Sequence, residues 1–108
     1  MLGLKTILQF KKQISKDPRF NTKAELIRCM GDPTCLKILY ILSKEKEVCP
    51  SDLVNILNLS MPAISHQLSR LRQMKIVVSE RMGKEICYSF SNTKAAILVN
   101  SLVKKIVW

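Results

Sequence analysis

The sequence predicts a mainly α-helical domain that carries one β-hairpin, an α+β fold. Apolar residues recur at helical spacing along most of the chain, and strand-like alternation is confined to residues 76–90. Glycine (3) and proline (4) are scarce, which favours helices over a turn-rich β-sandwich. The 108 residues have the length of one ordinary domain, so residues 1–108 are expected to form a single unit.

The first predicted element is a basic amphipathic helix within residues 1–20. Its apolar residues are Leu4, Ile7, Leu8 and Ile14, and its lysines are Lys5, Lys11, Lys12 and Lys16. The sequence "DPRF" at 17–20 ends this helix. Such a helix can lie on an anionic membrane, but it more often packs on a partner or a second subunit. We expect an N-terminal dimerisation helix or arm.

Two further helices are predicted from their start and stop signals. "NTKAELIRCMG" begins at an N-cap, Asn21 or Thr22, and ends at Gly31. In "DPTCLKILYILSKE", Asp32 is a good N-cap and Pro33 suits the first helical turn. The expected buried stripe of this helix is Leu36, Leu39 and Leu42.

Residues 51–73 are predicted to form two helices joined by a tight turn. The first is the short helix "PSDLVNILN", with Leu53, Ile56 and Leu57 directed inward. A β-hairpin follows at 76–90, and its turn is centred on Gly83, which is free to take positive φ. Two helices, a tight turn and a hairpin in this order predict a winged helix-turn-helix.

The second helix of this pair, "SMPAISHQLSRLR", contains the only histidine of the chain. At about 100° per residue, Ile64, Leu68 and Leu71 group on one face, which must be the core side. His66 lies on the opposite face, together with Pro62, Ser69 and Arg70, so it points away from the core.

His66 has no partners for catalysis or for metal binding in this stretch. Ser65 is its sequence neighbour and so does not face it on a helix, and no acidic residue lies between 60 and 79 to orient the imidazole. A metal site needs several convergent ligands, and this helix offers one. A solvated face and a DNA-reading face remain as interpretations.

The last predicted helix spans residues 92–107, with Asn92 as its cap. Its apolar residues fall at positions 95, 98, 99, 102, 103 and 106. That stripe is wide for an exposed terminal helix, which indicates packing against another chain. We expect a C-terminal dimerisation helix.

The net charge of +10 is unevenly distributed. Residues 1–30, 60–85 and 86–108 carry an excess of Lys and Arg, whereas residues 31–59 hold three bases and four acids. Clustered bases either solvate a surface or neutralise the phosphates of a polyanion. At this size and charge, nucleic acid is the favoured partner.

No membrane or export signal is expected. Lys5 and Gln9 interrupt the apolar N-terminal run, and no stretch of about 18 apolar residues occurs. We therefore expect a cytoplasmic protein whose four cysteines, Cys29, Cys35, Cys49 and Cys87, are thiols and not a disulfide framework. Without an acid/base pair or a phosphate loop, an enzyme is not expected.

The sequence resembles the ArsR/SmtB family of dimeric winged-helix repressors. The resemblance is carried by "MGDPTCLKILYIL" (30–42), "EVCPSDL" (47–53), "LSMPAISHQLSRLR" (59–72) and "RMGKEICYSF" (81–90). It implies a homodimer built from the first and last helices, bound as a repressor to an inverted repeat, which we expect to be AT-rich. The alternative is a winged-helix dimer that binds a protein or RNA and has neither operator nor inducer.

The resemblance also implies a set of DNA-binding residues. The helix "SMPAISHQLSRLR" would be the recognition helix, which lies in the major groove of the DNA. The hairpin would be the wing, which touches the flanking backbone or minor groove. The helix residues are Ser60, Met61, Pro62, Ala63, Ser65, His66, Gln67, Ser69, Arg70 and Arg72, and the wing residues are Arg81, Gly83 and Lys84.

The sequence departs from the family's inducer patterns. Where some members have Cys-x-Cys, this chain has Cys49 followed by Pro50 and Ser51, so only the first thiol matches. The last-helix ligands for zinc-type ions correspond to Asn92-x-Lys94 and Lys105-x-x-Trp108, so that site is absent. Cys49 is thus the best candidate for a soft ligand of As(III), Cd(II) or Cu(I), or for a redox thiol. A small residue at a loop–helix junction is its alternative interpretation.

Cys29 and Cys35 close one predicted helix and open the next. They are expected to be partly buried and close to each other or to Cys49, as further metal or redox candidates. Small core residues are their stronger interpretation. Cys87 alternates with Ile86 and Tyr88 on a strand of the wing, and it is interpreted as packing or surface.

Overall fold

The computed structural model describes residues 1–107 and contains six helices and a two-stranded antiparallel hairpin within them. The helices are α1 (Leu4–Ser15), α2 (Arg19–Met30), α3 (Pro33–Lys44), α4 (Pro50–Leu57), α5 (Met61–Gln73) and α6 (Lys94–Val107). The strands are β1 (Val77–Met82) and β2 (Glu85–Phe90). This order confirms the predicted α+β fold with its β-hairpin. Trp108, which entered the last-helix comparison, lies outside the described residues.

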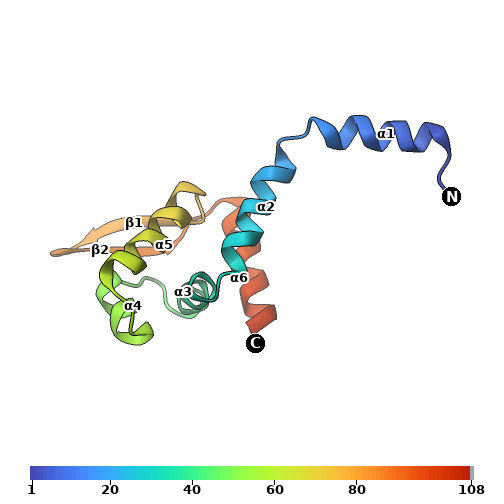
Figure 1. Cartoon of the computed structure of the whole chain (residues 1–108). Helices are drawn as coiled ribbons and strands as arrows, with labels where there is room; N and C mark the ends of the chain where they lie inside the picture. The colour runs from blue at the N-terminus through green and yellow to red at the C-terminus, as the bar shows by residue number, and fades with distance from the viewer. Residues whose placement is uncertain (108) are drawn as a thin grey trace.

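The molecule is elongated, at 60 × 26 × 23 Å, because α1 stands away from the other elements (Figure 1). No residue of α1 is buried. The body is formed by α3 against α6 and β2, α4 against α5, and α5 against β1. None of the helices within residues 1–107 is long and apolar enough to cross a membrane.

The core lies where α3, α4, α5, α6 and the base of the hairpin meet. Leu39, Leu53, Leu68 and Val99 are fully buried there. The predicted α3 stripe is correct for Leu39 and Leu42, whereas Leu36 is only half-buried. The remaining fully or almost fully buried apolar positions of this core are Cys29, Cys35, Ile38, Val48, Ile64, Leu71, Ile76, Val77 and Val103.

The start of α3 and the turn of the hairpin were predicted correctly, because both depend on residues that are neighbours in sequence. Asp32 accepts a hydrogen bond from the Cys35 N–H at 3.1 Å, and Pro33 follows at the start of α3. Gly83 has a φ of +66° at the tip of the hairpin, a conformation that favours glycine.

Two other predicted caps are wrong. Helix α2 begins at Arg19, after Pro18, and not at Asn21 or Thr22. The Asp17 carboxylate accepts from the Arg19 N–H at 2.9 Å, so this loop aspartate satisfies a donor at the new helix start.

At α6, the side chain of Thr93, not that of Asn92, accepts from the Ala96 N–H at 3.1 Å. The Thr93 hydroxyl also donates to the Lys75 carbonyl at 2.9 Å, which anchors the start of α6 to the turn between α5 and β1.

The apolar face of α6 is divided between the core and solvent. Ala96, Val99 and Val103 are buried, whereas Leu98 and Ile106 are 56% and 64% exposed. A single chain therefore leaves part of the apolar face of α6 exposed to solvent. The apolar residues of α1 are exposed in the same way.

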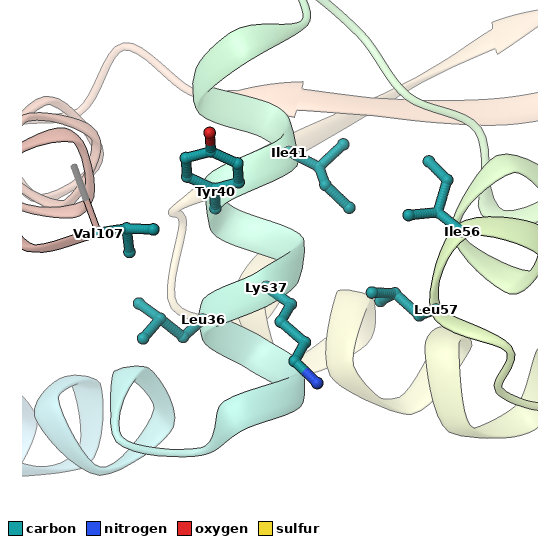
Figure 2. Close-up of a pocket in the computed structure, with 7 residues that line it drawn as sticks. All are labelled: Leu36, Lys37, Tyr40, Ile41, Ile56, Leu57 and Val107. Carbon is teal, nitrogen blue, oxygen red and sulfur yellow. The ribbon is translucent and has the colours of Figure 1, made fainter.

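Ile56 was predicted to face inward, but it is 60% exposed. It lines an open apolar pocket of about 320 Å³ between α3, α4 and the end of α6. Figure 2 shows Ile41 of α3 facing Ile56 and Leu57 of α4, while Val107 lies on the other side of α3. Ile56 therefore borders this open space and does not pack into the core.

Candidate nucleic-acid interface

Helix α5 begins at a side-chain cap. The Ser60 hydroxyl accepts a hydrogen bond from the Ala63 N–H at 3.3 Å, and Pro62 occupies the first turn, where its missing N–H costs no helical bond. The helix ends at Gln73, and Lys75 takes a φ of +61° as the chain turns into β1. These local features fix both ends of the predicted recognition helix.

The two faces of α5 are separated as the helical spacing predicts. Ile64, Leu68 and Leu71 have no exposed surface. Met61, Pro62, Ala63, Ser65, His66 and Ser69 are exposed, and no hydrogen bond from another residue of 1–107 engages the side chain of Ser65, His66 or Ser69. The exposed face of α5 thus presents small or apolar residues at its start and the polar side chains of Ser65, His66 and Ser69 after them.

Other polar residues of α5 contact the protein. Gln67 Nε2 donates to Asp32 Oδ2 at 2.8 Å, so this amide is directed to the start of α3. Arg70 Nη2 lies 3.4 Å from Glu25 Oε1 on α2. These contacts fasten α5 to the preceding helices on the side of Gln67 and Arg70.

Arg72 is exposed and extends toward the hairpin, where Arg72 Nη1 donates to Ser79 Oγ on β1 at 3.4 Å. Arg81, Gly83 and Lys84 are exposed at the far end of the hairpin. The ion pairs found within residues 1–107 include neither Arg81 nor Lys84, so their positive charges are not neutralised there.

Cys49 and Cys87 form a disulfide, so the prediction of four thiols is wrong for this pair. Val48 and Tyr88 exchange two backbone hydrogen bonds, of 2.8 and 2.7 Å, in an antiparallel bridge. Cys49 follows Val48 and Cys87 precedes Tyr88, so the antiparallel pairing places the two cysteines opposite each other. The disulfide joins the start of α4 to the β1–β2 hairpin.

Glu85 lies beside this disulfide, and the sequence had not marked it as a site residue. The sulfurs of Cys49 and Cys87 and a carboxylate oxygen of Glu85 all lie within 4.8 Å of one another. Ser51 Oγ donates to Glu85 Oε1 at 2.7 Å. Glu85 and Cys87 share one face of β2 because they are two residues apart. This spacing is the sequence feature that could have placed Glu85 beside Cys87.

Cys29 and Cys35 form a second, separate pair. Their sulfurs lie 2.8 Å apart, and neither side chain has any exposed surface. The expectation that they lie close to each other is confirmed, and Cys49 is paired elsewhere. The hydrogen bond with Cys35 lowers the pKa of the Cys29 thiol, and the same bond together with burial raises the pKa of Cys35.

The comparisons with known proteins agree with this geometry. Residues 32–79 match the family model for bacterial regulatory proteins of the arsR family. The chain is 33% identical over 89 residues, 82% of its length, to a cadmium resistance transcriptional regulatory protein CadC homolog of Staphylococcus aureus, and covers 73% of that relative. The chain belongs to the arsR family.

Solved structures of this family have the same fold. The transcriptional repressor PagR of Bacillus anthracis is 32% identical with a TM-score of 0.66, and the match covers 82% of this chain and 95% of that one. The repressor BigR of Xylella fastidiosa is 31% identical with a TM-score of 0.70, and the match covers 82% of this chain and 87% of that one. Family membership makes the chain a DNA-binding transcriptional regulator with a winged helix-turn-helix.

Within this arsR-family fold, α4 and α5 are the helix-turn-helix and the β1–β2 hairpin is the wing. The family match begins at Asp32, which accepts from Gln67, and ends at Ser79, which accepts from Arg72. The Cys87 half of the disulfide lies beyond the matched segment, on the second strand of the wing.

Proposed function

We propose that the chain is a repressor that inserts the exposed face of α5 into the major groove of an inverted-repeat operator. The observation that carries this proposal is the exposure of Ser65, His66 and Ser69 opposite three fully buried apolar residues. Hydroxyl and imidazole groups donate and accept hydrogen bonds at base edges. Met61, Pro62 and Ala63 allow close approach at the helix start, where Ser60 is bound to the backbone as a cap.

The cations of the wing, together with Arg72, position the protein on the DNA backbone. Arg81 and Lys84 at the tip of the wing have no acidic partner among the described residues, and Gly83 shapes the turn that presents them. Such cations bind phosphates and give affinity that falls with salt. Arg72 supports the phosphate contacts from between α5 and β1, whereas Gln67 and Arg70 hold α5 to the body.

The operator-binding form is a homodimer through α1 and α6. Exposed apolar side chains on α1 include Leu4 at 72% and Leu8 at 54%, and those on α6 include Ile97 at 62% and Ile106 at 64%. Two terminal helices with uncovered apolar faces are suited to pair with their copies in a symmetric interface. The symmetry then places two α5 helices in successive major grooves, about 34 Å apart.

The signal that releases the repressor is directed at thiols. Relatives named for cadmium resistance and for arsenic resistance support a soft metal or metalloid ion such as Cd(II), As(III) or Cu(I), and the Cys49–Cys87 disulfide supports an oxidant. Cys49 is the candidate receiver, and the buried Cys29–Cys35 pair is the second. We assign the regulator no catalytic activity and place it in the cytoplasm, where the DNA is.

Selection from a pool of random duplex DNA tests this function. The full chain is expected to enrich a palindrome whose half-sites lie about 10 base pairs apart, centre to centre. A chain with Ser65→Ala and His66→Ala together is expected to lose that enrichment. Failure of the unmodified chain to enrich any palindrome would instead favour a module that binds protein or RNA.

A further inference from the structure

We propose that Cys49, Cys87 and Glu85 form, when the disulfide is reduced, a binding site for a soft divalent cation such as Cd(II). The ion would join the start of α4 to the wing. The same two sulfurs make the disulfide when oxidised, so metal binding and oxidation exclude each other. This deepens the proposed function by assigning its signal to a site, although the site itself does not depend on DNA binding.

The ligand atoms are already close enough for one ion. The two sulfurs and a Glu85 oxygen lie within 4.8 Å of one another. In a tetrahedral zinc site with Zn–S bonds of about 2.3 Å, neighbouring sulfurs are about 3.8 Å apart, and Cd(II), a larger ion, needs a somewhat wider spacing. Side-chain rotation after reduction is enough to reach that separation, because the Val48–Tyr88 bridge holds the backbones on either side together.

The donor set suits a soft or borderline ion. Two thiolates select such ions over magnesium or calcium, and the carboxylate supplies a third ligand and a third negative charge. The fourth position is open to water, because Glu85 is exposed and Cys49 is half-buried. Three protein ligands and one open position also admit a small competing thiol that could remove the ion.

The surroundings favour the metal-binding form of each ligand. Cys49 is the N-cap of α4, where the positive end of the helix dipole stabilises a thiolate. Asp52 accepts from the Cys49 N–H at 3.2 Å and so holds the residue at the helix start. The Ser51 hydroxyl donates to Glu85 Oε1 and leaves Oε2 to bind the ion. A hydrogen bond of this kind orients a metal-binding carboxylate.

Oxidation uses the same atoms and needs a two-electron oxidant such as hydrogen peroxide. One thiol takes an oxygen from the peroxide and becomes a sulfenic acid, and one water is released. The second thiolate attacks that sulfur, the S–S bond forms, and the oxygen leaves as a second water. Overall, two thiols are oxidised and one peroxide is reduced to two waters. Neither sulfur can then become a thiolate, the form that binds the metal ion.

Titration of the full chain with Cd(II), in the absence of DNA, tests the site. The protein is first reduced and freed of reductant without oxygen, and binding is followed by the ultraviolet thiolate-to-cadmium charge-transfer band. We expect one ion per chain, with affinity reduced about 100-fold or more by Cys49→Ser or Cys87→Ser and about tenfold by Glu85→Gln. Glu47→Gln, an exposed carboxylate outside the group, is the matched control and should bind normally.

Peroxide treatment before the titration is expected to abolish binding in the unmodified chain, and a phosphine reductant should restore it. Glu85→Gln keeps both cysteines, so it tests the site even where a cysteine variant fails to fold. Unchanged cadmium affinity in Glu85→Gln and in a folded Cys87→Ser chain would overturn the proposal and assign the ion to Cys29 and Cys35. Because no DNA is present, neither result depends on operator binding.

Discussion

Gln67 of α5 donates a hydrogen bond of 2.8 Å to the Asp32 carboxylate, which also caps α3. The same oxygen, Asp32 Oδ2, accepts from the Cys35 N–H and from Gln67 Nε2. The position of α5 is therefore tied to the start of α3 and, through Cys35, to the buried Cys29–Cys35 pair. An acceptor with a negative charge strengthens both bonds.

Replacing Gln67 by Ala is expected to lower the free energy of unfolding by about 2 kcal/mol, since one charge-assisted bond is lost while the cap of α3 remains. Gln73→Ala, an exposed glutamine at the end of the same helix, is the matched control and should change stability little. Urea denaturation of both variants measures the difference. Equal stability of the two variants would mean that the Gln67–Asp32 bond contributes nothing.

Reduction of the Cys49–Cys87 disulfide is expected to destabilise the domain. The bond closes a loop across a sequence separation of 38, and constraining the unfolded chain to that extent contributes about 4 kcal/mol in the chain-entropy model. Thermal unfolding with and without a phosphine reductant measures this effect. A chain with Cys49→Ser and Cys87→Ser should no longer respond to reductant; a full response in that chain would point to Cys29 and Cys35.

The dimer interface is tested by placing a charge on the exposed face of α6. Leu98 is 56% exposed in the single chain, and Leu98→Glu is expected to convert a dimer of 12.3 kDa chains to monomer because a carboxylate would be buried in the interface. Ile56→Glu is the control, since Ile56 is 60% exposed but lies on α4 beside the pocket. Light scattering after size-exclusion chromatography gives the masses, and a dimeric Leu98→Glu chain contradicts this interface.

The wing is expected to contribute affinity without sequence preference. Lys84→Ala should weaken binding to operator and to random DNA by the same factor and make the log–log salt dependence shallower by about 1, because one phosphate contact is lost. Lys37→Ala removes an exposed lysine beside the pocket and should leave both affinities unchanged. A larger loss on operator than on random DNA would show that Lys84 reads bases.

Features that depend on neighbours in sequence were predictable. The faces of α5 follow from the spacing of Ile64, Leu68 and Leu71, and the Asp32 cap follows from its place before Pro33. The hairpin tip follows from Gly83, which adopts the positive φ that the turn requires. The family resemblance, carried by residues 30–90, added to this local information the expectation of a homodimer that binds DNA.

Features that depend on distant segments were not predictable. The partners in the Gln67–Asp32 bond are 35 residues apart, and no local pattern pairs them. The family resemblance implied a DNA-binding role for Gln67 and carried no information on this bond. The disulfide follows from the Val48–Tyr88 bridge, whose register no local pattern specifies. Ile56 was placed inward by helical spacing alone, without knowledge of the open pocket beside it.

The most direct test of base reading by α5 is the ratio of operator affinity to random-DNA affinity, measured by fluorescence anisotropy at one salt concentration. Ser65→Ala and His66→Ala are each expected to lower this ratio by between about fivefold and 150-fold, the range for one base contact. Ser101→Ala, an exposed serine on α6, should leave the ratio unchanged. If Ser65→Ala and His66→Ala weaken operator and random DNA equally, this face of α5 does not read the sequence.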